Sequence, residues 1–280
     1  MLKQITKQVL NNLRLTRETK TASYAVTKQF DADSDAFVVI PLPLVNQRQR
    51  LLGYDLNFEA DRISSNNYNL LLAKVKQPKL VKLKYRLEVK PVNLAVQQLN
   101  YIRQQSSFDK KIIDKINPYD QEIISIANRI TSNSTIEFVK QAYNLVINKL
   151  RYGKPIKGLY SYKQALTLDY VDCGGFCTLL ASILLVRKIP VELVVGELYT
   201  SRTGSAGMHV WLEIKLKNNQ RFPLDPSVDW RNRHFLSSRF AGFGKLSSYH
   251  IVLSYGLNHK LPILNQRVEL FQSVLKYKNV

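Results

Sequence analysis

The stretch DCGGFCTLLASILLVRKIP, residues 172–190, decides the fold. Its apolar residues predict a helix over residues 174–188, and Cys173 directly precedes that helix. Backbone N–H groups at a helix start lack intrahelical partners, and with the positive end of the helix dipole they favour a thiolate. Cys173 is therefore a candidate nucleophile and its backbone amide a candidate oxyanion donor, while the flanking glycines would let a substrate backbone approach.

Strand patterns follow this helix, and helical patterns precede it. The segments after it that are expected to be strands are residues 191–199, 208–216, 220–225 and 249–256. The segments before it with helical spacing of apolar residues are 95–105, 110–118, 120–130 and 132–153. In the last of these, Ser134 or Asn133 is the expected N-cap and Gly153 the stop. An apolar helix followed by an antiparallel sheet is typical of an α+β fold.

Residues 20–90 contain short apolar runs separated by turns, which predicts a small all-β, sandwich-like domain. The expected strands are residues 23–30, 35–44, 51–60, 68–75 and 79–89. The predicted division is a β-rich domain over residues 1–95, a helical linker over 96–120 and a catalytic domain over 121–280. A short N-terminal helix containing Asn11 and Asn12 is also considered.

The composition is that of a folded globular protein: 280 residues, 45% hydrophobic and 22% charged. No apolar run approaches the roughly 18 residues of a membrane helix, and the N-terminus has no signal-peptide core, which favours a cytoplasmic location. Two cysteines, Cys173 and Cys177, are too few for a disulfide framework. No EF-hand calcium loop is visible, and no cofactor or metal is expected.

The net charge of +20 comes from 41 Lys and Arg against 21 Asp and Glu, and such a field attracts phosphates. The basic residues are scattered, however, and the densest segment, residues 74–90, alternates charged and apolar residues from Lys82 onward. This alternation predicts a half-buried strand with a charged solvent face at a sheet edge, and an anion-binding stripe is the alternative. No nucleic-acid-binding module is recognisable, so nucleic acid is not an expected partner.

A nucleophilic thiol needs a base and a group that orients the base. His209 begins the strand His-Val-Trp-Leu-Glu, and Asp225 ends the next strand-like segment. If these strands are adjacent and antiparallel, Asp225 would hold one imidazole nitrogen of His209 while the other faces the sulfur of Cys173. A zinc site of Cys173, Cys177, His209 and Asp225 is the alternative, although two cysteines four positions apart do not match a zinc knuckle.

Four pieces of sequence resemble, in this order, the transglutaminase-like superfamily of papain-related cysteine enzymes: Asp172-Cys173, Ile189-Pro190, His209-Val210-Trp211-Leu212-Glu213 and Asp225-Pro226. The resemblance covers about residues 125–230, and a β-rich domain before such a core is familiar in bacterial and archaeal members. The departures from the family pattern, which leave the subfamily open, are Val171, Lys188 and Val191-Glu192.

The resemblance implies a papain-like core with Cys173, His209 and Asp225 as the catalytic triad and with Cys177 facing the core. It also implies a peptidase or amidase that hydrolyses amide bonds in a protein or peptide through a thioester acyl-enzyme. Amine transfer is one alternative, and a catalytically silent module that binds a partner protein through the N-terminal β domain is another. The side chain that completes the oxyanion site is open, with Tyr162 and Gln164 as candidates.

Several other polar and aromatic residues are interpreted as structural residues without a catalytic role. The histidines expected to be ordinary surface or core residues are His234, His250 and His259. Trp211 and Trp230 are interpreted as packing residues, with Trp211 also a candidate shield of the site from the opposite strand face. The arginines interpreted as a solvated loop, with attraction of an acidic substrate as the alternative, are Arg231, Arg233 and Arg239.

Overall fold

The computed structural model describes residues 18–32, 36–75, 79–101, 114–156, 158–200, 205–235, 239–256, 258–261, 266–269 and 275–278. It combines helices with several antiparallel sheets, so the predicted α+β class is confirmed. The chain forms two compact units. Unit 1 includes Val92–Leu193 and Val210–Ser247, and unit 2 includes Lys20–Pro91, Val194–His209 and the residues from Ser248 onward. The considered helix at Asn11 and Asn12 lies outside the described residues, as do residues 102–113 of two expected helices.

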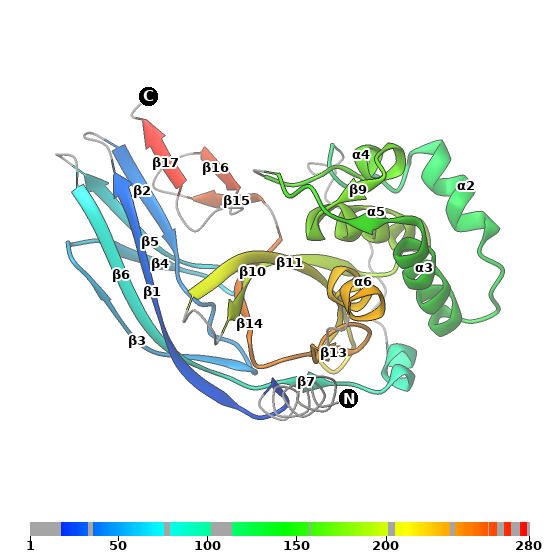
Figure 1. Ribbon diagram of the computed structural model, residues 1–280, viewed down its shortest axis with the longest axis horizontal. Coiled ribbons are helices and arrows are strands. Elements are labelled where there is room, and N and C mark those ends of the chain that lie inside the picture. Colours follow the sequence, from blue (N-terminus) through cyan, green and yellow to red (C-terminus); the bar gives the residue numbers. More distant parts are fainter. Residues whose placement is uncertain are drawn as a thin grey trace, which may run out of the picture. The chain divides into compact units, whose positions relative to one another are not determined.

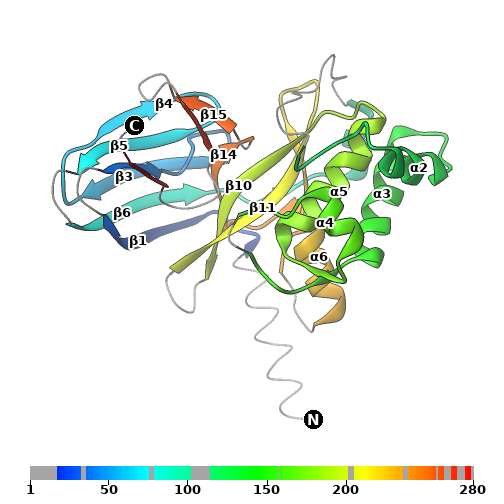
Figure 2. The same ribbon diagram turned by 90° about the horizontal axis from the view of Figure 1, so that it is seen from above.

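Unit 2 contains two antiparallel sheets (Figure 2). One has the order β1-β6-β3, with bounds Ala22–Ala32, Lys79–Val89 and Gln49–Leu56. The other has the order β17-β2-β5-β4, with bounds Leu275–Lys278, Ala36–Pro41, Asn69–Val75 and Asp61–Ser64. A separate pair is formed by β15 (Asn258–Leu261) and β16 (Gln266–Glu269). Strand β4 is absent from the sequence prediction, which has a turn from residue 63.

The core of unit 2 joins both of these sheets. Apolar residues of β1, β2, β5 and β6 form one buried cluster, to which β6 contributes Val81, Leu83, Tyr85, Leu87 and Val89. The intervening residues of β6 are exposed or half-buried, so the predicted alternation is confirmed. The expectation of a sheet edge is wrong, because β6 lies between β1 and β3. Alternation shows which face of a strand is buried, but it does not show how many neighbours the strand has.

Unit 1 is organised around helix α5 (Cys173–Val186), which has every residue from Gly174 to Leu185 buried. The helices that pack against α5 are α2 (Gln121–Arg129), α3 (Thr135–Lys149), α4 (Tyr162–Thr167) and α6 (Pro226–His234) (Figure 1). A helix surrounded in this way is apolar on all sides, as its sequence is. Within the described ranges, no helix has the length and apolar character needed to cross a bilayer.

The shorter elements of unit 1 connect these helices. They are η1 (Val96–Tyr101), the antiparallel pair β7 (Val92–Asn93) and β13 (Lys245–Leu246), and the parallel pair β8 (Arg151–Tyr152) and β9 (Tyr170–Val171).

The structure shows where helix α3 begins and ends. The Ser134 side chain accepts a hydrogen bond from the backbone N–H of Glu137 at 3.1 Å, so Ser134, rather than Asn133, is the N-cap. The helix ends at Lys149, before the predicted stop at Gly153. The backbone N–H of Gly153 instead donates to the carbonyl oxygen of Val171, and this bond continues the β8–β9 pair.

Two long strands, β10 (Val191–Thr200) and β11 (Ser205–Lys215), each belong partly to unit 1 and partly to unit 2. Within unit 1, β11 pairs antiparallel with β12 (Arg221–Leu224), as predicted. Within unit 2, β10 pairs antiparallel with β14 (His250–Tyr255). The compact units are therefore interleaved in sequence, whereas the predicted division into 1–95, 96–120 and 121–280 is continuous.

Candidate active site

Cys173 is the first residue of α5, at the position expected from the sequence. The helix is capped by Asp172, whose Oδ1 accepts the backbone N–H of Gly174 at 2.8 Å. The second oxygen, Oδ2, accepts the backbone N–H of Ile156 at 3.2 Å. The carboxylate thus fixes the segment that enters the helix, and Cys173 follows it as a partly exposed free cysteine.

The two glycines after Cys173 are required by packing. A Cβ atom at Gly174 would lie 2.6 Å from Cδ1 of Leu159, and one at Gly175 would lie 2.5 Å from Cβ of Val171. Both glycines are buried, so the first turn of α5 is pressed against its neighbours on that side. This packing explains why both residues are glycine. The expected role of the glycines in admitting a substrate backbone is not needed to explain them.

Cys177 lies one helical turn later and has a different environment. It is fully buried, and its thiol donates a hydrogen bond to the carbonyl oxygen of Val210 at 3.5 Å. Burial, followed by the negative charge of Asp225, raises the pKa of the Cys177 thiol well above its usual value. The thiol of Cys177 is thus a buried packing group that is hydrogen-bonded to the backbone. Cys177 faces the core, as the resemblance implies.

We expect Cys177 to resist iodoacetamide in the folded protein between about pH 7 and pH 9, because the reagent needs an accessible thiolate. Intact-mass measurement on Cys173→Ser, in which Cys177 is the remaining cysteine, reads this directly. The same variant should take up one equivalent of reagent after denaturation in urea. Native labelling at a rate similar to that in urea would contradict the buried position.

Asp225 is fully buried at the end of β12, where it is the N-cap of α6. Its Oδ1 accepts two hydrogen bonds at 3.0 Å, from the backbone N–H of Val228 and from the hydroxyl of Ser227. Its backbone oxygen accepts a bond from the hydroxyl of Tyr143 at 3.0 Å, and burial, followed by the charge of Asp229, raises the pKa of that phenol. The carboxylate is therefore held rigidly, with a definite structural role as a cap.

His209 lies on β11 in unit 2 and is 5% exposed. Its ring lies against that of His250 on β14, with 5.6 Å between the ring centroids and 63° between the planes. His250 is a fully buried core residue of β14, although its contact with His209 was not expected from the sequence. The next residue after His209 is Val210, which accepts the Cys177 hydrogen bond. Imidazole is a common metal ligand, so the neighbouring rings of His209 and His250 are two groups that could bind a metal ion.

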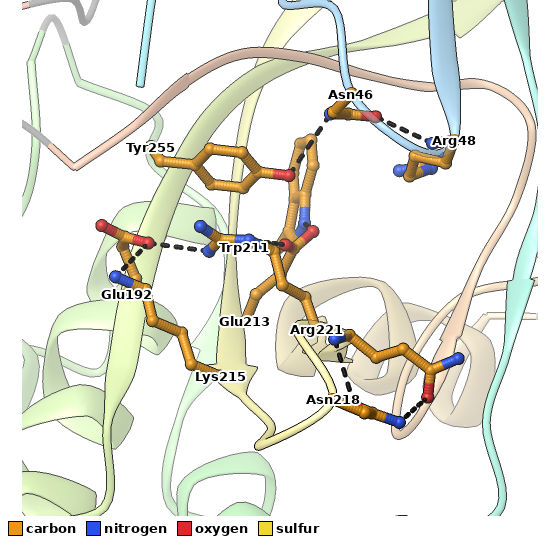
Figure 3. A network of polar contacts seen from close by, with 10 residues as sticks. Asn46, Arg48, Glu192, Trp211, Glu213, Lys215, Asn218, Arg221 and Tyr255 are labelled. Atoms are coloured by element: carbon orange, nitrogen blue, oxygen red, sulfur yellow. Dashed lines mark hydrogen bonds and ion pairs between the residues drawn. The ribbon is translucent and has the colours of Figure 1, made fainter. Parts of the chain in front are cut away.

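Trp211 and Glu213 brace β11 immediately after His209 (Figure 3). The indole Nε1 of Trp211 donates to Oε1 of Glu213 at 3.0 Å, and both side chains are buried. Arg221 lies 4.0 Å from Glu213 Oε2 and donates to Oε2 of Glu192 at 2.7 Å. Residues two apart share one strand face, so Trp211 is on the face of His209, and the expectation of a shield on the opposite face is wrong.

Within unit 1, Tyr152 pairs with Val171, two residues before Cys173, and Arg231 lies over the Tyr152 ring. The guanidinium carbon of Arg231 is 5.2 Å from the ring centroid of Tyr152. Burial, followed by the charge of Cys173, raises the pKa of Tyr152 to about 12, and the charge of Arg231 opposes this rise. Arg231 is half-buried on α6, so the interpretation of this residue as part of a solvated loop is wrong. Tyr152 escaped the sequence analysis because it belongs to no motif.

The two candidates for the oxyanion side chain have structural partners. The hydroxyl of Tyr162 donates to Oδ2 of Asp120 at 2.9 Å, and Tyr162 is buried. The side chain of Gln164 accepts the backbone N–H of Ser161 at 2.9 Å and completes a capping box at the start of α4. Both side chains therefore serve helix starts, and neither is carried forward as an oxyanion donor.

The remaining aromatic and histidine residues pack as expected. His234 stacks on Trp230 with 4.3 Å between ring centroids, and its Nδ1 is 2.9 Å from the carbonyl oxygen of Trp230. His259 lies edge-on to Tyr68 at 4.9 Å in unit 2. These contacts explain the three side chains without a catalytic role.

Comparisons with known proteins agree with the fold. Residues 124–226 match the model of the transglutaminase-like superfamily. A candidate cysteine protease from Cytophaga hutchinsonii has a similar structure, with a TM-score of 0.58 and 14% identity over 84% of this chain and 83% of that chain. The periplasmic domain of TgpA from Pseudomonas aeruginosa is more distant, with a TM-score of 0.41 and 12% identity over 79% and 86%. A comparison with curated protein sequences gives no match. The match to the family model over residues 124–226, which include Cys173 at the start of α5, confirms the resemblance seen in the sequence.

Proposed function

We propose that this protein is a cysteine-dependent acyl-transfer enzyme, a peptidase or amidase, with Cys173 as nucleophile, His209 as base and Asp225 as the group that orients the base. The observation that carries the proposal is the contrast between the two cysteines. Cys173 is a partly exposed thiol in the first turn of α5, and Cys177 is buried and hydrogen-bonded. The match to the transglutaminase-like model and the similarity to a candidate cysteine protease support a cysteine-dependent enzyme.

In the proposed reaction, His209 accepts the thiol proton of Cys173, and the sulfur attacks the carbonyl carbon of an amide. The tetrahedral intermediate collapses, the C–N bond breaks, and the protonated imidazole of His209 gives its proton to the departing amine. A thioester then joins the acyl group to Cys173. Water, deprotonated by His209, attacks this thioester, which releases the carboxylic acid and restores the thiol.

The first-turn amides of α5 are the proposed donors to the oxyanion. Two of these N–H groups have partners, because Gly174 donates to Oδ1 of Asp172 and Phe176 donates to the backbone oxygen of Asp172. The N–H groups of Cys173 and Gly175 have no acceptor in the preceding turn of the helix. The backbone N–H of Cys173 itself is the candidate closest to the nucleophile, since it belongs to the same residue. No side chain is assigned to this role.

Iodoacetamide labelling tests the thiolate that the proposal needs. At neutral pH, Cys173 of the wild type should be alkylated about tenfold faster than Cys173 of His209→Ala, since the imidazolium stabilises the thiolate. His234→Ala is the matched control, because it removes an imidazole that stacks on Trp230, and its labelling rate should equal that of the wild type. Equal rates in all three proteins would overturn the assignment of His209.

The acceptor and the cellular setting belong to the same proposal. Hydrolysis of a protein or peptide is proposed over transfer to an amine, and adding a primary amine to the assay separates them, because transfer would incorporate the amine into the product.

A cytoplasmic location is likewise proposed from the sequence. A partner protein for the β-rich unit is an alternative that becomes the working hypothesis if Cys173 is inert.

A further inference from the structure

Arg231 carries a positive charge that pairs with no acidic side chain in the described part of the protein. Among the described residues its guanidinium forms no ion pair or hydrogen bond, and its contact is with the ring of Tyr152 at 5.2 Å. Arg233, two residues later on α6, differs because it forms an ion pair with Asp229 at 3.6 Å. A guanidinium has five N–H donors in a planar fork that matches a carboxylate, and an aromatic ring satisfies none of them.

Two acidic groups of unit 1, Asp172 and Asp225, already accept hydrogen bonds from the backbone. Asp172 accepts the N–H groups of Gly174 and Ile156, and Asp225 accepts that of Val228. Both are buried, and neither lies within ion-pair distance of Arg231 in the described structure. The described residues therefore supply no counter-ion to Arg231. Its guanidinium lies over the ring of Tyr152, which pairs with Val171 two residues before Cys173.

Two further cations extend this basic region along β8 and β9. The guanidinium carbon of Arg151 and the ammonium of Lys154 lie 6.0 and 5.9 Å from the ring centroid of Tyr170, which is three residues before Cys173. Both are exposed, and neither forms an ion pair among the residues that the structure describes. Three basic groups, those of Arg231, Arg151 and Lys154, thus lie over aromatic rings of β8 and β9, and they would attract an anionic substrate.

We propose that Arg231 binds a carboxylate of the substrate beside Cys173, so that the enzyme prefers amides next to an acidic residue or a free C-terminal carboxylate. The proposal rests on the proposed function and adds its substrate class. Tyr152 holds the guanidinium in place by its ring, and the N–H fork then faces the incoming carboxylate. Arg231 is a specificity residue in this scheme, and it takes no part in the transfer of protons.

Two alkylating reagents of opposite preference test the anion site without requiring turnover. Iodoacetate carries a carboxylate and iodoacetamide is neutral, so the ratio of their rates at Cys173 reports the local attraction for anions. In Arg231→Gln this ratio should fall by about threefold at low salt, a size typical of an exposed ion pair. Arg129→Gln, which removes an exposed arginine at the end of α2, should leave it unchanged. An unchanged ratio in Arg231→Gln would overturn the proposal.

Peptide pairs that differ only in Glu or Gln beside the scissile amide test the substrate class. We expect wild-type kcat/KM to favour Glu by about tenfold, and we expect Arg231→Gln to lose this preference while still cleaving the Gln peptide. Equal preference in the wild type and in Arg231→Gln would contradict the proposal. If the iodoacetate ratio depends on Arg231 but no peptide is cleaved, the anion site stands and the proposed hydrolase fails.

Discussion

Asp225→Asn should lower kcat/KM for the best peptide substrate by about 10³- to 10⁴-fold and leave the protein folded. The amide oxygen of Asn can still accept the N–H of Val228 and the hydroxyl of Ser227, and Asn is as good an N-cap as Asp. The amide carries no charge, however, so it cannot stabilise a protonated His209 or hold its reactive tautomer. Steady-state kinetics and thermal unfolding on the same preparation separate these two roles.

The matched control is Asp120→Asn. Asp120 is the N-cap of α2, where it accepts the backbone N–H of Glu122 at 2.9 Å. Its replacement repeats the same chemical change at a helix start that has no part in the proposed reaction, so kcat/KM should stay near the wild-type value. Cys173→Ala sets the floor, since it removes the nucleophile itself. If Asp225→Asn keeps wild-type activity, Asp225 is a cap alone and the proposed triad is incorrect.

The parts of the molecule that were predictable are those with a local signal. The run from Phe176 to Val186 is apolar on every side, and a helix of that kind must be surrounded, as α5 is. The alternation in residues 82–90 identifies the buried face of β6 for the same reason, because a strand places successive side chains on opposite faces. Ser134 is a cap that its own position and residue type reveal.

The parts that escaped prediction depend on residues far apart in the chain. The contact of His209 with His250 requires β14 to pair with β10, and no spacing in the sequence records that pairing. The central position of β6 depends on β1 and β3 in the same way. Arg231 and Tyr152 meet because α6 lies near β8, and neither residue belongs to a motif. Local patterns show which side chains of a segment are buried, but they do not show which other segments it contacts.

Gly175→Ala should be the most destabilising small substitution near the active site, with a loss of about 2 to 4 kcal/mol in the free energy of unfolding. Alanine is a better helix former than glycine by about 1 kcal/mol, which would stabilise α5 if space were available. The added Cβ would instead lie 2.5 Å from Cβ and 2.7 Å from Cγ2 of Val171. Val171 is fully buried and its Cβ is bonded to the backbone of β9, so it cannot rotate away.

Gly53→Ala is the control, because its Cβ would meet only the end of the flexible Arg86 side chain at 3.6 Å. That variant should unfold within about 0.5 kcal/mol of the wild type in urea, in line with other substitutions away from the core. Val171→Gly combined with Gly175→Ala should cost less than the sum of the two single changes, because the first removes the atoms that the second strikes. Additive costs would show that Gly175→Ala does not act through its clash with Val171. A shortfall would show that the close contact between α5 and β9 limits residue 175 to glycine, which the pattern Cys-Gly-Gly alone does not reveal.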